Sequence, residues 1–164
     1  MNDFAETEHS GMNTVMAHRA FGPHAERALV AVREEMARLE GLLSRYIATS
    51  EISRLNELSG TGSVILSADT YAVLARAHAF SRRCRGLFDI AIGPLVNLWR
   101  EAKETGEAVT DDRIGQVLPL INHDDLMLTP RGRTARLGKK GQSVDLGGIA
   151  KGYAGDRTLD IFRQ

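Results

Sequence analysis

The chain has 164 residues, of which 43% are hydrophobic and 26% are charged, proportions typical of a globular protein that buries a core. Lys and Arg total 21 and Asp and Glu also total 21, so the net charge is zero at neutral pH. A dedicated nucleic-acid-binding domain is usually basic, and a single cysteine excludes an internal disulfide. We therefore expect neither a nucleic-acid partner nor a disulfide framework.

The first eleven residues are polar and acidic and have no apolar signal core. No run of the sequence has the length and apolar character of a membrane span. We therefore expect a disordered tail over residues 1–11, a folded part over residues 12–164, and a cytoplasmic protein without a membrane span.

The first elements expected after the tail are a strand over residues 14–21 and a helix over residues 25–46. Apolar residues recur along this helix every three to four positions, at Ala25, Leu29, Val32, Met36, Leu39, Leu43 and Tyr46. Ser50 is placed to cap a short helical turn that follows. Asn56 then either closes that turn in the left-handed conformation or directs its amide to a ligand.

The middle of the chain predicts a helix that starts after Ser67 and stops at Gly86, followed by a strand over residues 87–92. Because a carboxylate inside an apolar strand is costly unless it is paired, Asp89 is a candidate functional residue. Further helices are expected over residues 95–104 and 111–118, then a hairpin of residues 126–129 and 134–137. The fold class is therefore α+β.

The stretch from Asp145 to Gly152 joins an expected strand end at residues 143–144 to a last helix that runs to Gln164. Its two adjacent glycines allow a ligand to approach the backbone closely. A helix start and Lys151 both supply positive potential, which suits a phosphate, and Asp145 is placed to meet a metal, a ribose or a base. The alternative is a structural corner with a surface lysine.

Nothing in the sequence supports zinc chemistry or a nucleophilic triad. The histidines at positions 9, 18, 24, 78 and 123 lack metal-ligand spacing, and neither a Gly-x-Ser-x-Gly nor a Walker motif is present.

Three separated motifs together resemble the ApbE family, whose members are FAD:protein FMN transferases. They are Ser44-x-Tyr46-x3-Ser50-Glu51-Ile52-x2-Leu55-Asn56, Phe88-Asp89-Ile90-x2-Gly93-Pro94-Leu95-x2-Leu98-Trp99, and Asp145-Leu146-Gly147-Gly148-Ile149-Ala150-Lys151-Gly152-Tyr153. Met12-Asn13-Thr14 resembles the Met-Gly-Thr at the start of the family domain, with Asn13 in place of the glycine, and Ala91 stands where the family often has threonine.

The resemblance implies a mixed or antiparallel sheet with packed helices, related to the T-fold. It spans residues 12–164, which would be the N-terminal part of the family domain, so the fold is expected to be incomplete at its C-terminus. The second half of that domain normally carries a histidine and the aspartate and threonine metal ligands.

The implied activity is Mg²⁺-dependent transfer of FMN from FAD to a threonine hydroxyl of a target flavoprotein, with release of AMP. The implied partners are that flavoprotein and a separately encoded C-terminal half. Two alternatives stay open: a truncated, inactive FAD-binding or interaction module, and a general phosphate-binding protein.

The resemblance also assigns candidate site residues. Those implied to line the FAD site are Met12, Tyr46, Leu87, Phe88, Asp89, Asp145 and Lys151. The carbonyl of Gly148 would contact Mg²⁺, and Asn56 would lie near the flavin or the pyrophosphate as a candidate catalytic residue. Met12 and Phe88 are otherwise core residues, and Tyr46 otherwise packs along its helix.

Overall fold

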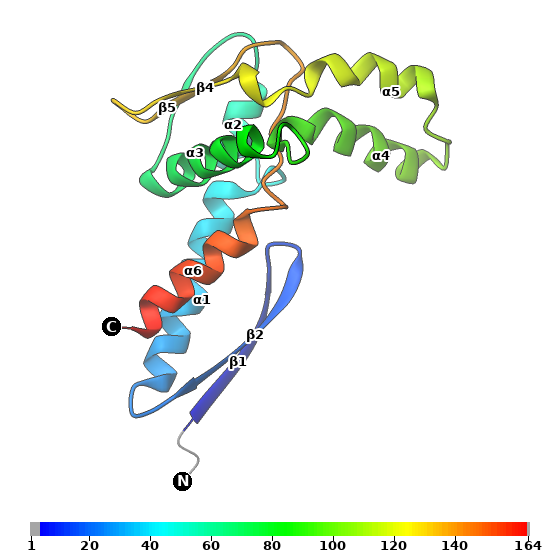
Figure 1. Cartoon of the computed structure of the whole chain (residues 1–164). Coiled ribbons are helices and arrows are strands. Elements are labelled where there is room, and N and C mark those ends of the chain that lie inside the picture. Colours follow the sequence, from blue (N-terminus) through cyan, green and yellow to red (C-terminus); the bar gives the residue numbers. More distant parts are fainter. Residues whose placement is uncertain (1–3, 164) are drawn as a thin grey trace.

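The computed structural model describes residues 4–163 and has the α+β architecture that the sequence predicts (Figure 1). Its strands form two separate antiparallel sheets, a hairpin of β1 and β2 and a three-stranded sheet in the order β3-β5-β4. The strands are β1 (Phe4–Gly11), β2 (Thr14–Phe21), β3 (Val64–Ile65), β4 (Leu126–Thr129) and β5 (Thr134–Leu137). The α-helices are α1 (Ala25–Leu43), α2 (Glu51–Glu57), α3 (Ala68–Arg83), α4 (Gly93–Thr105), α5 (Asp111–Val117) and α6 (Ala150–Phe162).

The strand predicted over residues 14–21 is confirmed, but the disorder predicted over residues 1–11 is wrong for residues 4–11. These residues form β1, which pairs with β2 from Phe4 opposite Phe21 to Gly11 opposite Thr14. Met12 and Asn13 join the strands with φ of 49° and 59°, as a tight hairpin turn requires. The acidic residues of β1 fall on the exposed face of the hairpin, which is why the segment looked like a polar tail. Residues 1–3 lie outside the described part of the chain.

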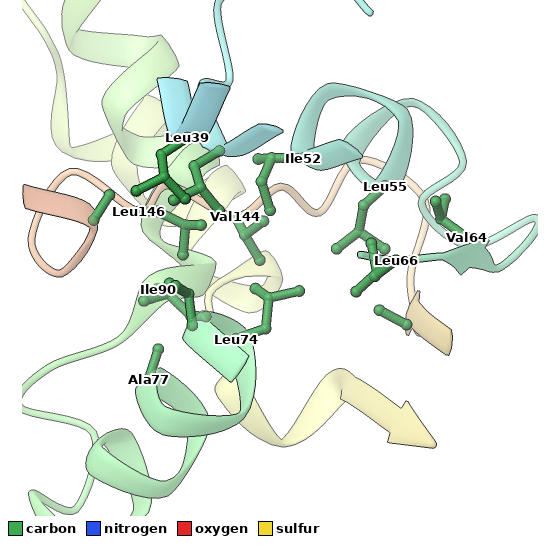
Figure 2. Packing of buried hydrophobic residues seen from close by; sticks show 14 of the residues in the cluster. Leu39, Ile52, Leu55, Val64, Leu66, Leu74, Ala77, Ile90, Val144 and Leu146 are labelled. Carbon is green, nitrogen blue, oxygen red and sulfur yellow. The ribbon is translucent and has the colours of Figure 1, made fainter. Parts of the chain in front are cut away.

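Helix α1 carries the predicted apolar stripe into the core, and its residues Leu29, Val32, Met36, Leu39 and Leu43 are buried. Figure 2 shows Leu39, Ile52 and Leu74 converging with Val144 from the far end of the chain. Each fully buried aliphatic side chain contributes roughly 1.5–3 kcal/mol relative to an exposed one. The helix ends at Leu43 and not at Tyr46, because Ser44 adopts an extended conformation and its carbonyl accepts a hydrogen bond from the Ser50 hydroxyl.

The predicted helix caps are confirmed. The hydroxyls of Ser50, Ser67 and Thr110 each accept a hydrogen bond from the backbone N–H three residues later, at the starts of α2, α3 and α5. Helix α3 ends where Gly86, with φ of 79°, donates its N–H to the carbonyl of Ser81.

The two strands predicted over residues 87–92 and 143–144 do not form. Ile90–Ile92 is a short 3₁₀ helix, and residues 142–146 have no regular secondary structure. Residues 142–146 are instead held by the 3₁₀ helix and the start of α4: Asp145 N–H donates to the Ile90 carbonyl at 2.8 Å, and Gly93 N–H donates to the Ser143 carbonyl at 3.1 Å. These bonds satisfy backbone groups that would otherwise require a sheet partner.

The hairpin of β4 and β5 is confirmed, and β3, which the sequence analysis did not predict, adds to β5 through Val64 and Ile65. Helices α4 and α5 pack against each other and extend to one side of the molecule (Figure 1). Among the helices of residues 4–163, none combines the length and the apolar character that crossing a membrane requires.

Candidate functional site

One cavity, here called the main cavity, has a volume of about 970 Å³ and lies where four segments meet. These are the β1–β2 turn, the end of α1 with the loop after it, Arg100 of α4, and the turn that leads into α6. Four of the predicted site residues line it: Met12, Tyr46, Asp145 and Lys151. Other lining residues include Asn13, Glu40, Arg45, Arg100 and Gly147. Positions distributed over most of the sequence therefore meet at one site.

The turn before α6 is shaped by the carboxylate of Asp145. Its Oδ1 accepts the N–H of Gly147 at 2.8 Å, and its Oδ2 accepts a hydrogen bond from Arg45 Nη1 at 2.9 Å. A Cβ on Gly147 would lie 3.0 Å from Asp145 Oδ1, and one on Gly148 would lie 3.0 Å from Phe88 Cε2. The two glycines therefore admit neighbouring groups of the protein itself, the carboxylate at one and the phenyl ring at the other.

Helix α6 starts at Ala150 without a side-chain cap at Ile149. The N–H groups of its first turn, together with Lys151 beside them, give this end of the cavity a positive potential. Lys151 is exposed and lines the main cavity. An anionic ligand is the species that such an end favours.

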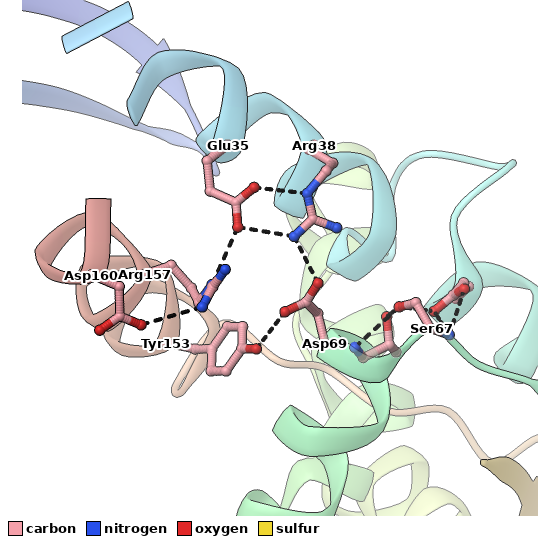
Figure 3. Close-up of polar contacts among 9 residues, drawn as sticks. Glu35, Arg38, Ser67, Asp69, Tyr153, Arg157 and Asp160 are labelled. Carbon is pink, nitrogen blue, oxygen red and sulfur yellow. Dashed lines mark hydrogen bonds and ion pairs between the residues drawn. The ribbon is translucent and has the colours of Figure 1, made fainter. Parts of the chain in front are cut away.

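Helix α6 is fixed to the rest of the fold by a polar network drawn in Figure 3. The hydroxyl of Tyr153 donates to Asp69 of α3 at 2.6 Å, and Arg157 donates to Glu35 of α1 at 3.3 Å. Arg38 connects the two halves by donating to both Glu35 and Asp69. Burial and the hydrogen bond to Asp69 raise the pKa of Tyr153 to about 12. The direction of α6, and so of its N-terminus, is set by these contacts.

Arg45 is a residue of the site that the sequence analysis did not identify. Its side chain is 8% exposed, and its guanidinium also donates to Asn97 Oδ1 at 2.5 Å. The available signal was a strongly cationic side chain between Ser44 and Tyr46, inside one of the three motifs. Its partner Asp145 stands one hundred positions later, so no local pattern indicates the pair.

Tyr46 is 59% exposed, and the guanidinium groups of Arg45 and Arg100 lie 5.7 Å and 5.8 Å from the centroid of its ring. Cation–π attraction of this kind is worth about 0.5–1 kcal/mol at exposed sites. Tyr46 is therefore a surface residue of the cavity and does not pack along α1. The ring therefore lines the cavity, and the two guanidinium groups beside it stabilise its position.

The other predicted site residues do not line the main cavity. Asp89 is occupied by the chain itself: Oδ1 accepts from Ala91 N–H at 2.7 Å, and Oδ2 accepts from His123 N–H at 2.9 Å and lies 3.1 Å from His123 Nδ1. It caps the 3₁₀ helix, so its cost as a carboxylate among apolar residues is offset. Leu87 is 94% exposed, and Phe88 packs edge-on against Phe80.

Asn56 does not close its turn in the left-handed conformation. Its Nδ2 donates to the carbonyl of Val144 at 3.1 Å, and its Oδ1 accepts the Val144 N–H at 2.7 Å. The side chain thus satisfies both backbone groups of Val144, as a neighbouring strand would. Asn56 contributes to the site by positioning the segment that precedes the Asp145 turn.

The described residues do not fit a Mg²⁺ site with side-chain ligands. Within residues 4–163, no group of three or more His, Cys, Asp or Glu side chains is arranged to hold a metal ion. Both oxygens of Asp145 already have partners, and Gly148 supplies only backbone. Mg²⁺ prefers octahedral oxygen coordination with one or more carboxylates, which this set does not provide.

Comparison with known proteins assigns the family. The family model described as "ApbE family" matches residues 12–164. A protein of Klebsiella pneumoniae called FAD:protein FMN transferase is 34% identical over 142 residues, covering 86% of this chain and 45% of that protein. A protein of the same name from Treponema pallidum is 26% identical over 160 residues, covering 92% of this chain and 44% of that protein.

The fold agrees with the sequence relationship. The crystal structure of the ApbE protein of Thermotoga maritima superposes with a TM-score of 0.89 at 24% identity, covering 97% of this chain and 52% of that one. The chain therefore belongs to the ApbE family, and it spans about half the length of the curated relatives that it matches.

Proposed function

We propose that this chain provides the FAD-binding part of an FAD:protein FMN transferase. The observation that carries the proposal is the main cavity, where Met12, Tyr46, Asp145 and Lys151 meet although they are spread over 140 positions of the chain (from 12 to 151). Its volume of about 970 Å³ falls at the upper end of the range for ligand pockets, as an extended dinucleotide requires.

The chemistry of the cavity wall matches the parts of FAD. The N-terminus of α6 and Lys151 supply positive potential for the diphosphate, while the exposed ring of Tyr46 offers a stacking surface for a flavin or an adenine. In the proposed reaction a threonine oxygen of the target flavoprotein attacks the FMN phosphorus, and the bond from that phosphorus to the bridging oxygen breaks. AMP leaves with the bridging oxygen, and the threonine proton is released to solvent. Catalysis of this kind depends on positioning and charge stabilisation more than on covalent help.

The proposal includes Mg²⁺ as the ion that supports transfer in the complete enzyme. Since the described residues offer no side-chain set for it, its carboxylate and hydroxyl ligands are proposed to come from a further polypeptide segment, such as a separate C-terminal half. The carbonyl of Gly148 remains the contribution proposed for this chain. The proposed protein partner is a flavoprotein with an acceptor threonine.

Calorimetric or fluorescence titration of the purified chain with FAD tests the binding part of the proposal. We expect saturable FAD binding that ADP inhibits by competition. FMN should bind only weakly, because it lacks the diphosphate that is the expected anchor. Absence of any FAD binding would refute the proposal. AMP release is then measured with FAD, Mg²⁺ and a threonine-containing acceptor. Binding without AMP release in the presence of a C-terminal half would identify the chain as an inactive FAD-binding module.

A further inference from the structure

The guanidinium of Arg45 joins three segments at the wall of the main cavity. Nη1 donates to Asp145 Oδ2 at 2.9 Å on the turn before α6, and Nη2 donates to Asn97 Oδ1 at 2.5 Å on α4. Both nitrogens also lie 3.5 Å from the carbonyl oxygen of Gly93, at the start of α4. Arg45 is 8% exposed and Asp145 is 17% exposed, so this is a largely desolvated ion pair.

Each carboxylate oxygen of Asp145 already accepts one hydrogen bond from the protein itself. Oδ2 is bonded to Arg45 and Oδ1 to the N–H of Gly147. The sequence left Asp145 as a contact for a metal, a ribose or a base. In the folded protein its carboxylate instead connects Arg45 to the turn that starts α6.

The charge of this pair matters because the cavity is expected to receive an anion. A carboxylate in a poorly solvated wall, without its cation, would repel a diphosphate strongly, since Coulomb interactions are weakly screened there. With Arg45 in place the pair is neutral, and Lys151 and Arg100 remain as positive charges on the lining. Glu40, the other carboxylate on the lining, accepts the N–H of Met12 at 2.7 Å.

We propose that Arg45 is a positioning residue that makes the cavity accept a diphosphate: it neutralises and orients Asp145 without itself contacting the ligand. The inference rests on the proposed FAD site. If Arg45 were only structural, removing Arg45 or Asp145 should weaken FAD binding equally. The proposed role predicts instead that the two substitutions differ in their effect on FAD binding. Removing the positive member leaves an unpaired negative charge beside the diphosphate, whereas removing the negative member does not.

The test is the dissociation constant for FAD in the wild type and in Arg45→Met, Asp145→Asn and the double variant. We expect FAD binding about 30-fold weaker in R45M, because the unpaired carboxylate of Asp145 would repel the diphosphate across a poorly solvated wall. We expect a smaller loss of FAD affinity in D145N than in R45M, and recovery of the double variant R45M/D145N to about the affinity of D145N. R76M and D156N are matched controls, since that ion pair is exposed and does not line the main cavity, and both should bind FAD as the wild type does.

The outcomes separate this inference from the proposed function. A wild type that does not bind FAD refutes the proposed function. A wild type that binds FAD, with equal weakening in R45M and D145N or with no recovery in a folded double variant, refutes the role of Arg45 alone. If R45M does not fold, Arg45→Gln replaces it, because glutamine removes the charge but keeps a donor near Asn97.

Discussion

The hydroxyl of Tyr153 on α6 donates a 2.6 Å hydrogen bond to Asp69 on α3, and this bond fixes the helix whose N-terminus faces the main cavity. Asp69 is held in turn by Arg38 of α1 (Figure 3). Three helices that are distant in sequence therefore share one carboxylate. The orientation of the anion-binding end of α6 is decided some distance from that end, by contacts along its body.

Removing this hydroxyl should weaken the fold modestly. Tyr153→Phe keeps the ring and loses the hydrogen bond, so we expect the free energy of unfolding to fall by about 1 kcal/mol, the usual net worth of such a bond. Urea unfolding followed by circular dichroism measures the change. Tyr71→Phe is the control, since no side-chain hydrogen bond of Tyr71 is found among the described residues, and a similar decrease there would contradict the assignment.

The same hydroxyl predicts a pH dependence of stability. The pKa of Tyr153 is raised to about 12 from its ordinary value of 10.0, by burial first and by Asp69 second. A raised pKa means that the folded state holds the proton more tightly than the unfolded state does. Its stabilising contribution is therefore complete below pH 10 and is lost as the pH rises from 10 to about 12.

Comparison of the unfolding free energies of the wild type and Y153F across this range checks the prediction. The difference between the two proteins should shrink as the pH approaches 12. A difference that stays constant or grows would show that the phenol is not held protonated by Asp69.

Gly93 should not tolerate a side chain. A Cβ at this position would overlap the carbonyl oxygen and the hydroxyl of Ser143, which lies two residues before Asp145 in the segment that leads to α6. We expect Gly93→Ala to reduce the free energy of unfolding by about 2–3 kcal/mol, because the overlapping atoms are mostly backbone and cannot rotate away. The same variant should weaken FAD binding, because the segment must shift.

Gly155 on α6 provides the matched control for this substitution. No atom lies within 4 Å of a Cβ built on it, and it lies in a helix. Gly155→Ala should therefore raise the free energy of unfolding by about 0.5–1 kcal/mol. If both alanine variants moved stability in the same direction, crowding against Ser143 would not be the cause.

Lys151 should contribute to FAD affinity through charge alone. It lines the main cavity at the first turn of α6 and is exposed to solvent. We expect Lys151→Met to weaken FAD binding about tenfold at low salt and less at high salt, since exposed charges are screened. Titration at two ionic strengths measures this, with Lys140→Met, at an exposed turn outside the cavity, as the control. A loss independent of salt would point to a steric role.

Much of the local structure could be predicted because its causes are local. The stripe of α1, the caps at Ser50, Ser67 and Thr110, and the β4–β5 hairpin follow from periodicity and from side-chain oxygens that satisfy nearby N–H groups. The motifs also placed Met12, Tyr46, Asp145 and Lys151 in one site, and these four do line one cavity.

The errors arose where distant partners decide the outcome. β1 looked disordered because only its pairing with β2 and its packing on α1 bury one face of it. Residues 87–92 and 143–144 were predicted to be strands from their mostly apolar sequence. In the structure, backbone groups of residues 90–93 bond to those of Ser143 and Asp145, and the N–H of Val144 bonds to the side chain of Asn56. The sequence also did not show that Asp89 has a partner in the chain itself, because the N–H of His123, which it accepts, lies 34 positions away.

The sequence by itself determined the family, the α+β class and the helices, because these depend on motif spacing and on the period with which apolar residues recur. Only the tertiary structure decided what Asp145 does. Its charge is cancelled by Arg45, which lies one hundred positions earlier and is brought to it by the packing of α1, α4 and the segment before α6. A buried carboxylate is stable only with such a partner, and no pattern along the chain specifies which cation the fold will bring to it.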